Sequence, residues 1–236
     1  MDASLRDKVV LVHGATGNVG SALLAELARR EARIAAVVRR PWQVARVEAA
    51  LTEAGVPRSR HLVGVVDSED SEAASGFVKG AEDSLGPVAA LVSAAGAFAA
   101  ALLGTESSAL AGDLWRANFA SVHTLARAVV LPMQRRRAGT LVFVGARAVL
   151  APPRSGMALY RAAKAALHAY AECLDVELRV AGVRVRVFAP EIIDTPANRE
   201  AMPSADRSTW LAPAAVANRL LDLAAHPEAV PGVVCE

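Results

Sequence analysis

Tyr160 and Lys164 lie four positions apart in the sequence. In a helix this spacing places both side chains on one face, one turn apart. An ammonium group near a phenol favours the phenolate and lowers the tyrosine pKa, so Tyr160 could act as a general acid and base near neutral pH. The chain holds so few tyrosines and lysines that such a pair arises by chance in only about 3% of cases. The alternative is an ordinary surface pair.

A glycine-rich segment from Gly14 to Gly20 follows an apolar run and precedes an amphipathic one. Glycines allow a tight turn and let backbone N–H groups approach a pyrophosphate at a helix N-terminus. The pattern therefore predicts a dinucleotide-binding turn, the alternative being a purely structural one. The residues expected to bind the cofactor here are Gly14, Thr16, Gly17, Asn18, Val19 and Gly20.

Two arginines, Arg39 and Arg40, follow the second apolar run. An NAD site usually has an acid here for the ribose hydroxyls, but there is none between Arg33 and Gln43. Guanidinium groups instead suit a 2′-phosphate. The sequence therefore favours NADP(H), with NAD(H) still possible. A pair of solvated surface arginines is the alternative.

The ends of the third and fourth apolar runs also hold candidate cofactor-binding residues. Asp67 ends the third run and is placed to meet the adenine. The fourth ends in small residues that let the backbone lie close to a ligand, namely Ala94, Ala95 and Gly96.

The apolar runs alternate with amphipathic segments along the whole chain. The expected strands are Lys8–His13, Arg33–Val38, His61–Val66, Val88–Ala94, Thr140–Gly145 and Val183–Ala189, with a stub near Val233. The expected helices are Asn18–Glu31, Trp42–Ala54, Glu69–Leu85, Glu106–Arg136, Ser155–Ala181 and Ala214–Ala225. This order predicts an α/β fold, a doubly wound parallel sheet of the Rossmann type, in a single domain over residues 1–236. The proline-rich segment 190–213 is expected to be an irregular substrate lid.

Composition excludes several classes of protein. A hydrophobic share of 53% rules out disorder, and a net charge of +2 argues against nucleic-acid binding. The basic run Arg135 to Arg137 is expected to be a solvated helix end. Two cysteines, Cys173 and Cys235, form no disulfide framework or zinc site by themselves, so no metal is expected. Met1 to Lys8 lacks a signal-peptide core, and the uncharged stretch Leu85 to Thr105 contains Gly and Pro, so a cytoplasmic protein without a membrane span is expected.

Together these features resemble the short-chain dehydrogenase/reductase family over essentially the whole chain. Gly14, Gly17, Gly20, Asp67 and Ser93–Gly96 resemble its cofactor-binding residues, and Asn118, Tyr160 and Lys164 resemble its catalytic ones. Pro190 to Thr195, including Ile193, is similar to the segment that holds the nicotinamide carboxamide. The resemblance implies that Tyr160 exchanges a proton with the substrate oxygen, that Lys164 holds the nicotinamide ribose, and that Asn118 anchors a water.

Two positions depart from the family pattern. Asn18 stands where a glycine is usual, and asparagine tolerates left-handed backbone better than other residues with a side chain. The family serine, which donates to the reacting oxygen, should fall near Arg147, where there is no Ser or Thr. Arg147 is a candidate electrophile in its place, the alternative being a salt-bridged or solvated arginine.

A narrower resemblance is to the dihydropteridine reductases, which also lack that serine. It lies in the stretches Gly145–Leu150, Gly156–Met157, Asp194–Arg199 and Met202–Asp206 and in Trp210. These reductases typically have an aspartate where Arg39 or Arg40 stands, and they prefer NADH.

The leading hypothesis is an NADP(H)-dependent oxidoreductase that reduces a carbonyl or a quinonoid, pterin-like small molecule. The alternatives are an NADH-dependent dihydropteridine reductase, an ordinary ketoreductase or alcohol dehydrogenase, and a cofactor-binding sensor or scaffold without turnover. The family resemblance also implies a homodimer or homotetramer through the helices expected at Glu106–Arg136 and Ser155–Ala181.

Overall fold

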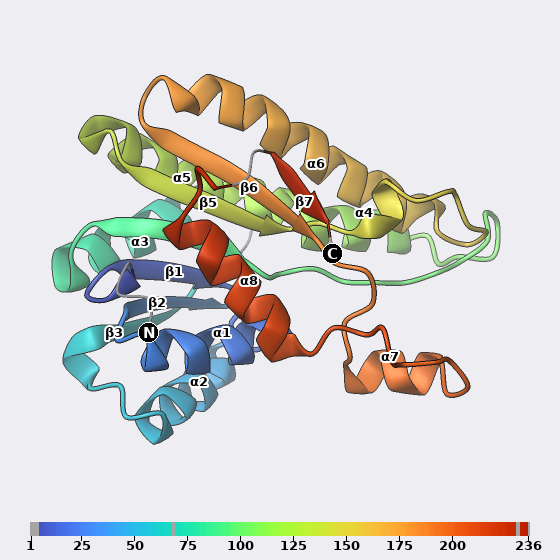
Figure 1. The fold of residues 1–236 in the computed structure, drawn as a ribbon, viewed down its shortest axis with the longest axis horizontal. Helices are drawn as coiled ribbons and strands as arrows, with labels where there is room; N and C mark the ends of the chain where they lie inside the picture. The colour runs from blue at the N-terminus through green and yellow to red at the C-terminus, as the bar shows by residue number, and fades with distance from the viewer. Residues whose placement is uncertain (1–4, 68, 230–231, 236) are drawn as a thin grey trace.

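The computed structural model describes residues 5–67, 69–229 and 232–235, and its centre is a parallel sheet between two layers of helices (Figure 1). The sheet order is β3-β2-β1-β4-β5-β6-β7, and every neighbouring pair is parallel. The strands are β1 (Val9–His13), β2 (Arg33–Val38), β3 (His61–Val65), β4 (Val88–Ser93), β5 (Gly139–Val144), β6 (Val183–Ala189) and β7 (Val233–Cys235). The doubly wound fold predicted from the sequence is confirmed. The six main strands lie within one residue of their expected bounds, because nearly continuous Val-rich runs are covered by helices on both faces.

Helices cover the two faces of the sheet as two separate apolar cores. The helices are α1 (Asn18–Arg29), α2 (Pro41–Glu53), α3 (Ser71–Leu85), α4 (Leu110–Trp115), α5 (Ser121–Arg136), α6 (Ala158–Arg179), α7 (Pro196–Ala201) and α8 (Pro213–Ala225). On one face α1, α2 and α8 pack on the sheet through residues such as Leu23, Leu51 and Leu220. On the other, α3, α5 and α6 do so through residues such as Val78, Leu125 and Leu167. None of the described helices is both long and apolar enough to cross a bilayer.

The helix expected over Glu106–Arg136 begins later and is not uniform. It starts at Leu110 and contains a π-helical turn, Arg116–Ala120, between α4 and α5. Asn118 lies in this turn and its Nδ2 donates to the Leu114 carbonyl oxygen at 2.9 Å. A side chain that binds a carbonyl of the preceding turn competes with the regular helical hydrogen bonds.

The segment 190–213 was expected to hold no regular element, and this was wrong. α7 begins at Pro196, where proline suits the first helical position, and Thr195 Oγ1 caps it by accepting from the Asn198 N–H at 3.2 Å. A bridge between Ile193 and Leu211 joins the two ends of the segment. α7 projects away from the sheet beyond the end of α8 (Figure 1).

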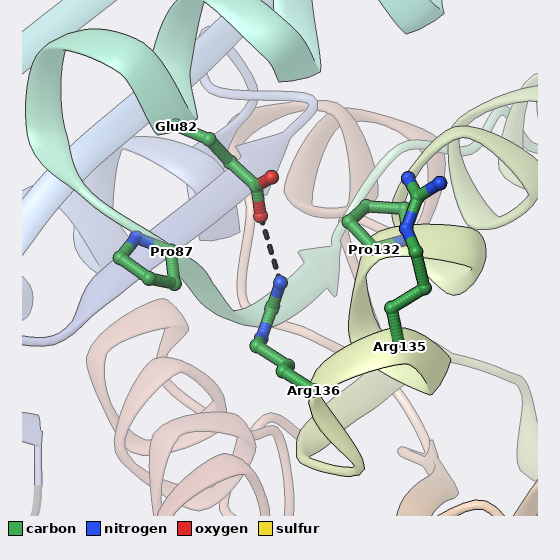
Figure 2. A pocket seen from close by; sticks show the side chains of 5 residues that line it. All are labelled: Glu82, Pro87, Pro132, Arg135 and Arg136. Atoms are coloured by element: carbon green, nitrogen blue, oxygen red, sulfur yellow. Dashed lines mark hydrogen bonds and ion pairs between the residues drawn. The ribbon is translucent and has the colours of Figure 1, made fainter.

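The basic run at the end of α5 is not simply solvated. Arg136 pairs with Glu82 of α3 at 2.8 Å and also donates to the Val88 carbonyl oxygen. Figure 2 shows this pair in a pocket of about 380 Å³, with Pro87, Pro132 and Arg135. Arg136 therefore ties α5 to α3 and β4 at the amino edge of the sheet.

Candidate active site

The turns after β1 and β4 are in direct contact at the carboxyl edge of the sheet. Gly14 has a φ of +83°, and a Cβ added there would lie 2.7 Å from the Ala95 nitrogen. The Ala94 N–H donates to the His13 carbonyl oxygen at 2.9 Å. A Cβ on Gly20 would lie 2.0 Å from the Gly14 oxygen. Both positions therefore require glycine, because backbone approaches backbone there.

The N-terminus of α1 points out of this turn without a capping side chain from the described residues. Gly17 is the N-cap, in extended conformation, and Asn18 is the first helical residue. Asn18 is not among the described residues with positive φ, so its side chain is accommodated without left-handed backbone. The uncapped N–H groups of the first turn, which includes Val19, suit a negatively charged group such as a pyrophosphate.

Arg39 and Arg40 follow β2 and are exposed beside the glycine turn. Both backbone N–H groups donate to Gln43 Oε1, at 3.1 and 2.9 Å, and Gln43 Nε2 donates to Thr16 Oγ1 at 3.2 Å. Burial, and secondarily the charge of Arg39, lowers the pKa of His13 to about 4. Gln43, which the sequence did not single out, thus connects the arginine turn to the glycine turn.

Asp67 lies just beyond the end of β3, and β3 is the neighbour of β2 in the sheet. Its side chain is exposed, and its Oδ1 accepts from the Glu69 N–H at 3.1 Å. This bond holds the carboxylate at the same edge as the arginine turn.

Asn118 and Lys164, from different helices, meet at Gly96. A Cβ added to Gly96 would lie 2.9 Å from Asn118 Oδ1 and 3.2 Å from Lys164 Nζ. Asn118 is fully buried and also donates to the Ala97 carbonyl oxygen at 2.9 Å. Lys164 Nζ donates to the Val144 carbonyl oxygen at 2.8 Å. The structure therefore brings together two of the residues predicted from the sequence to do chemistry.

Tyr160 lies one turn before Lys164 on α6, with its ring edge-on to Phe98 at 5.0 Å between centroids. Burial raises the pKa of Tyr160 to about 12 and lowers the pKa of Lys164 to about 8. The expected lowering of the tyrosine pKa is wrong. Desolvation of the phenol outweighs the ammonium, whose hydrogen bond goes to the backbone. The ring of Phe98 was not anticipated from the sequence.

The geometry fits a nicotinamide dinucleotide. An uncapped helix N-terminus, a backbone cradle of glycines and two exposed guanidinium groups lie at the carboxyl edge of the sheet, where ligands of doubly wound folds bind. Within the described residues, no group of three or more His, Cys, Asp or Glu side chains could hold a metal ion.

Comparison with known proteins agrees with this geometry. Residues 8–206 match the family model described as short chain dehydrogenase. The chain belongs to the short-chain dehydrogenase/reductase family. It is 31% identical over 196 residues to 2,3-dihydro-2,3-dihydroxybenzoate dehydrogenase of Bacillus subtilis, covering 81% of this chain and 72% of that protein.

It is also 31% identical over 208 residues to the 3-oxoacyl-[acyl-carrier-protein] reductase FabG of Pseudomonas aeruginosa, covering 88% and 82% of the two chains. A solved structure, ElxO with NADP bound, superposes with a TM-score of 0.86 at 18% identity, covering 97% and 96%. This short-chain dehydrogenase/reductase is therefore an NAD(P)-dependent oxidoreductase. The narrower resemblance to dihydropteridine reductases is not confirmed by these relatives.

Arg147, at the position of the missing family serine, forms an ion pair. Its Nε lies 3.3 Å from Glu191 Oε1, with both side chains nearly half exposed. Its backbone N–H donates to the Pro190 carbonyl oxygen at 3.0 Å. This arrangement corresponds to the salt-bridged alternative, and it connects the turn after β5 to the segment after β6.

Two further residues of the expected carboxamide segment of this short-chain dehydrogenase/reductase are engaged in local structure. Thr195 caps α7, and Ile193 forms the bridge to Leu211. Ile193 therefore holds the two ends of the segment 190–213 together, and Thr195 fixes the start of its helix.

Proposed function

We propose that this short-chain dehydrogenase/reductase reduces a carbonyl or a quinonoid, pterin-like small molecule with NADPH. The observation that carries the proposal is the convergence of Asn118 and Lys164 on Gly96, one helical turn from Tyr160. A buried ammonium, a buried amide and a phenol at the carboxyl edge of a dinucleotide-binding sheet form a proton-transfer site.

Each side chain has a distinct role in this proposal. The nicotinamide, when bound, supplies the hydride. Tyr160 is protonated at neutral pH, since its pKa is about 12, and gives its proton to the substrate oxygen. Lys164 holds the nicotinamide ribose and assists that transfer by its charge. Asn118 anchors the water through which the proton is replaced.

The preference for NADPH over NADH is supported by Arg39 and Arg40. In the part of the chain that the structure describes, no carboxylate forms an ion pair with either of them. Their backbone is fixed by Gln43, which leaves the guanidinium groups to bind a 2′-phosphate. The superposing structure ElxO has NADP bound.

A flat, apolar substrate is supported by the surroundings of Tyr160. Phe98 packs on the Tyr160 ring and is itself 55% exposed, so an apolar surface beside the phenol is open to a substrate. The Ala101 N–H donates to the Gly156 carbonyl oxygen at 2.9 Å, which joins the loop after β4 to the loop before α6. A quinonoid ring also needs less oxyanion stabilisation than a ketone, which would account for the missing serine.

The segment 190–213 is proposed as the lid over this substrate, with Met202 and Trp210 half-buried along it. The proposed assembly is a homodimer or homotetramer through α5 and α6, where Leu131 of α5 and Val176 of α6 are exposed apolar side chains.

The test follows the consumption of NADPH, and separately of NADH, with 9,10-phenanthrenequinone, quinonoid 6,7-dimethyldihydropterin and ethyl acetoacetate. The proposal predicts turnover with a quinonoid acceptor, and Tyr160→Phe lowers it at least 100-fold. Tyr170→Phe is the matched control, because Tyr170 pairs instead with His123 at 3.0 Å, and it should retain activity. Reduction of ethyl acetoacetate alone would indicate an ordinary ketoreductase. Turnover confined to the dihydropterin with NADH would indicate a dihydropteridine reductase. No turnover with either cofactor would indicate a sensor.

A further inference from the structure

His168 lies behind the candidate active site, one turn after Lys164 and two turns after Tyr160 on the same helix. Its side chain is buried, and its Nε2 accepts a hydrogen bond from the Ala146 N–H at 3.2 Å. Two residues earlier, the Val144 carbonyl oxygen accepts from Lys164 Nζ. α6 therefore holds the end of β5 at two successive points, one through the lysine and one through the histidine.

The imidazole of His168 fits closely between this turn and β6. A Cβ added to Gly145 would lie 2.3 Å from His168 Nε2 and 2.6 Å from Val187 Cγ1. The ring therefore cannot shift toward the turn without displacing its backbone. Gly145 is the residue that makes this close approach possible.

The bond from Ala146 requires an unprotonated Nε2, so the proton of a neutral ring is on Nδ1. Burial and the charge of Lys164 lower the pKa of His168 to about 4, so the ring is neutral at physiological pH. Val187 and the backbone of Gly145, which face the ring from β6 and from the turn, are uncharged. Nδ1 is buried without a partner among the described residues, which is costly, and the bond from Ala146 to Nε2 is the hydrogen bond that holds the ring there.

We infer that His168 is a positioning residue for the reaction. Its neutral imidazole fixes the turn from Gly145 to Arg147 against α6 and thereby sets Lys164 relative to Tyr160. His168 touches neither substrate nor cofactor in this account. The inference rests on the proposed function.

Two substitutions test the hydrogen-bond acceptor of His168 independently of the volume of its side chain. His168→Leu keeps the apolar bulk and leaves the Ala146 N–H unpaired, whereas His168→Gln keeps an acceptor at a similar reach. We expect His168→Leu to lower kcat for 9,10-phenanthrenequinone at least tenfold while KM for NADPH stays within twofold. His168→Gln should keep kcat within threefold of the wild type.

His61 provides a matched control at the opposite edge of the sheet. It is as buried as His168, one ring nitrogen contacts the Pro57 carbonyl oxygen at 3.1 Å, and the other has no partner in the described chain. His61→Leu should lower the temperature of unfolding and leave kcat unchanged. If His61→Leu lowered kcat as much as His168→Leu does, the loss of kcat would be explained by lower stability of the fold alone, and the inference would be overturned.

A second measurement on the wild type is independent of turnover and of whether the variants fold. Nitrogen-15 NMR of histidine-labelled protein reports the tautomer and pKa of each imidazole. We expect a neutral His168 ring with the proton on Nδ1 from pH 8 down to pH 5. A proton on Nε2, an ordinary pKa, or equal losses in the Leu and Gln variants would overturn the inference while leaving the proposed function intact. A wild type that reduces none of the acceptors would overturn the proposed function, and the inference with it.

Discussion

The amino group of Lys164 donates its hydrogen bond to the carbonyl oxygen of Val144, the last residue of β5, at 2.8 Å. The lysine is therefore anchored to the sheet, and its burial lowers its pKa to about 8. A cation held in this way is costly to the fold, and such costs are typical of sites kept for function.

Lys164→Met should stabilise the protein and abolish its activity. The pKa of Lys164 in the folded protein is about 8, below the ordinary value of 10.5. As the pH falls from 10.5 through 8, the unfolded chain therefore binds the proton first, and the free energy of unfolding decreases. At pH 7 the buried charge therefore opposes folding, by about 1.4 kcal/mol for each unit of depression, offset by roughly 1 kcal/mol for the hydrogen bond. Urea unfolding at pH 7 and pH 10 checks this. We expect the variant to be the more stable protein at pH 7, by a margin that shrinks at pH 10. A variant less stable than the wild type at pH 7 would contradict the account.

Gly96→Ala should remove turnover without unfolding the chain. The new Cβ would crowd Asn118 Oδ1 at 2.9 Å and Lys164 Nζ at 3.2 Å, so one of them must move. We expect kcat to fall at least tenfold. Gly80→Ala is the control, since a Cβ on this α3 residue meets nothing within 4 Å and should stabilise the helix by about 0.5–1 kcal/mol. Equal kcat values for the two variants would show that the contact at Gly96 is unimportant.

Arg147→Ala should leave both stability and turnover nearly unchanged. The partner of Arg147 is Glu191 in a half-exposed ion pair, and exposed pairs contribute about 0.2–1 kcal/mol. We expect kcat within twofold of the wild type. A drop of tenfold or more would instead support the electrophilic role considered from the sequence.

Stability should fall in mild acid because of His13. The ring is buried with Nδ1 2.9 Å from Ser93 Oγ, and its pKa of about 4 lies below the ordinary value of 6.5. The unfolded chain therefore binds a proton first, and stability is lost as pH falls from about 6.5 toward 4, by up to about 1.4 kcal/mol per pH unit for this group. Urea midpoints of the wild type and His13→Asn between pH 7.5 and 4.5 measure the difference. The variant should show the shallower decline, and parallel curves would exclude His13 as a cause.

The sequence predicted the sheet well because the pattern that defines it is local. Buried parallel strands such as Val183–Ala189 are unbroken apolar runs, and turns such as Gly14 to Gly20 require glycine for backbone reasons visible in the residue type. The spacing of Tyr160 and Lys164 likewise depends only on helical geometry.

The features that were not predicted from the sequence depend on tertiary contacts. The raised pKa of Tyr160 reflects burial, and the π-helical turn at Asn118 reflects a side chain bonded between two segments. His168 did leave a signal, because it continues the four-residue spacing of Tyr160 and Lys164. The spacing does not predict its hydrogen bond from the Ala146 N–H, because that contact joins α6 to the turn after β5.

Whether this reductase depends on NADPH is decided by the dissociation constants of NADPH and NADH, measured side by side by fluorescence titration. The account predicts that NADPH binds at least tenfold more tightly. Replacing Arg39 and Arg40 together by Ala should remove that difference, because a charge-assisted hydrogen bond is worth about 1.5–3 kcal/mol. Tighter binding of NADH by the wild type, or binding of neither dinucleotide, would contradict the claim.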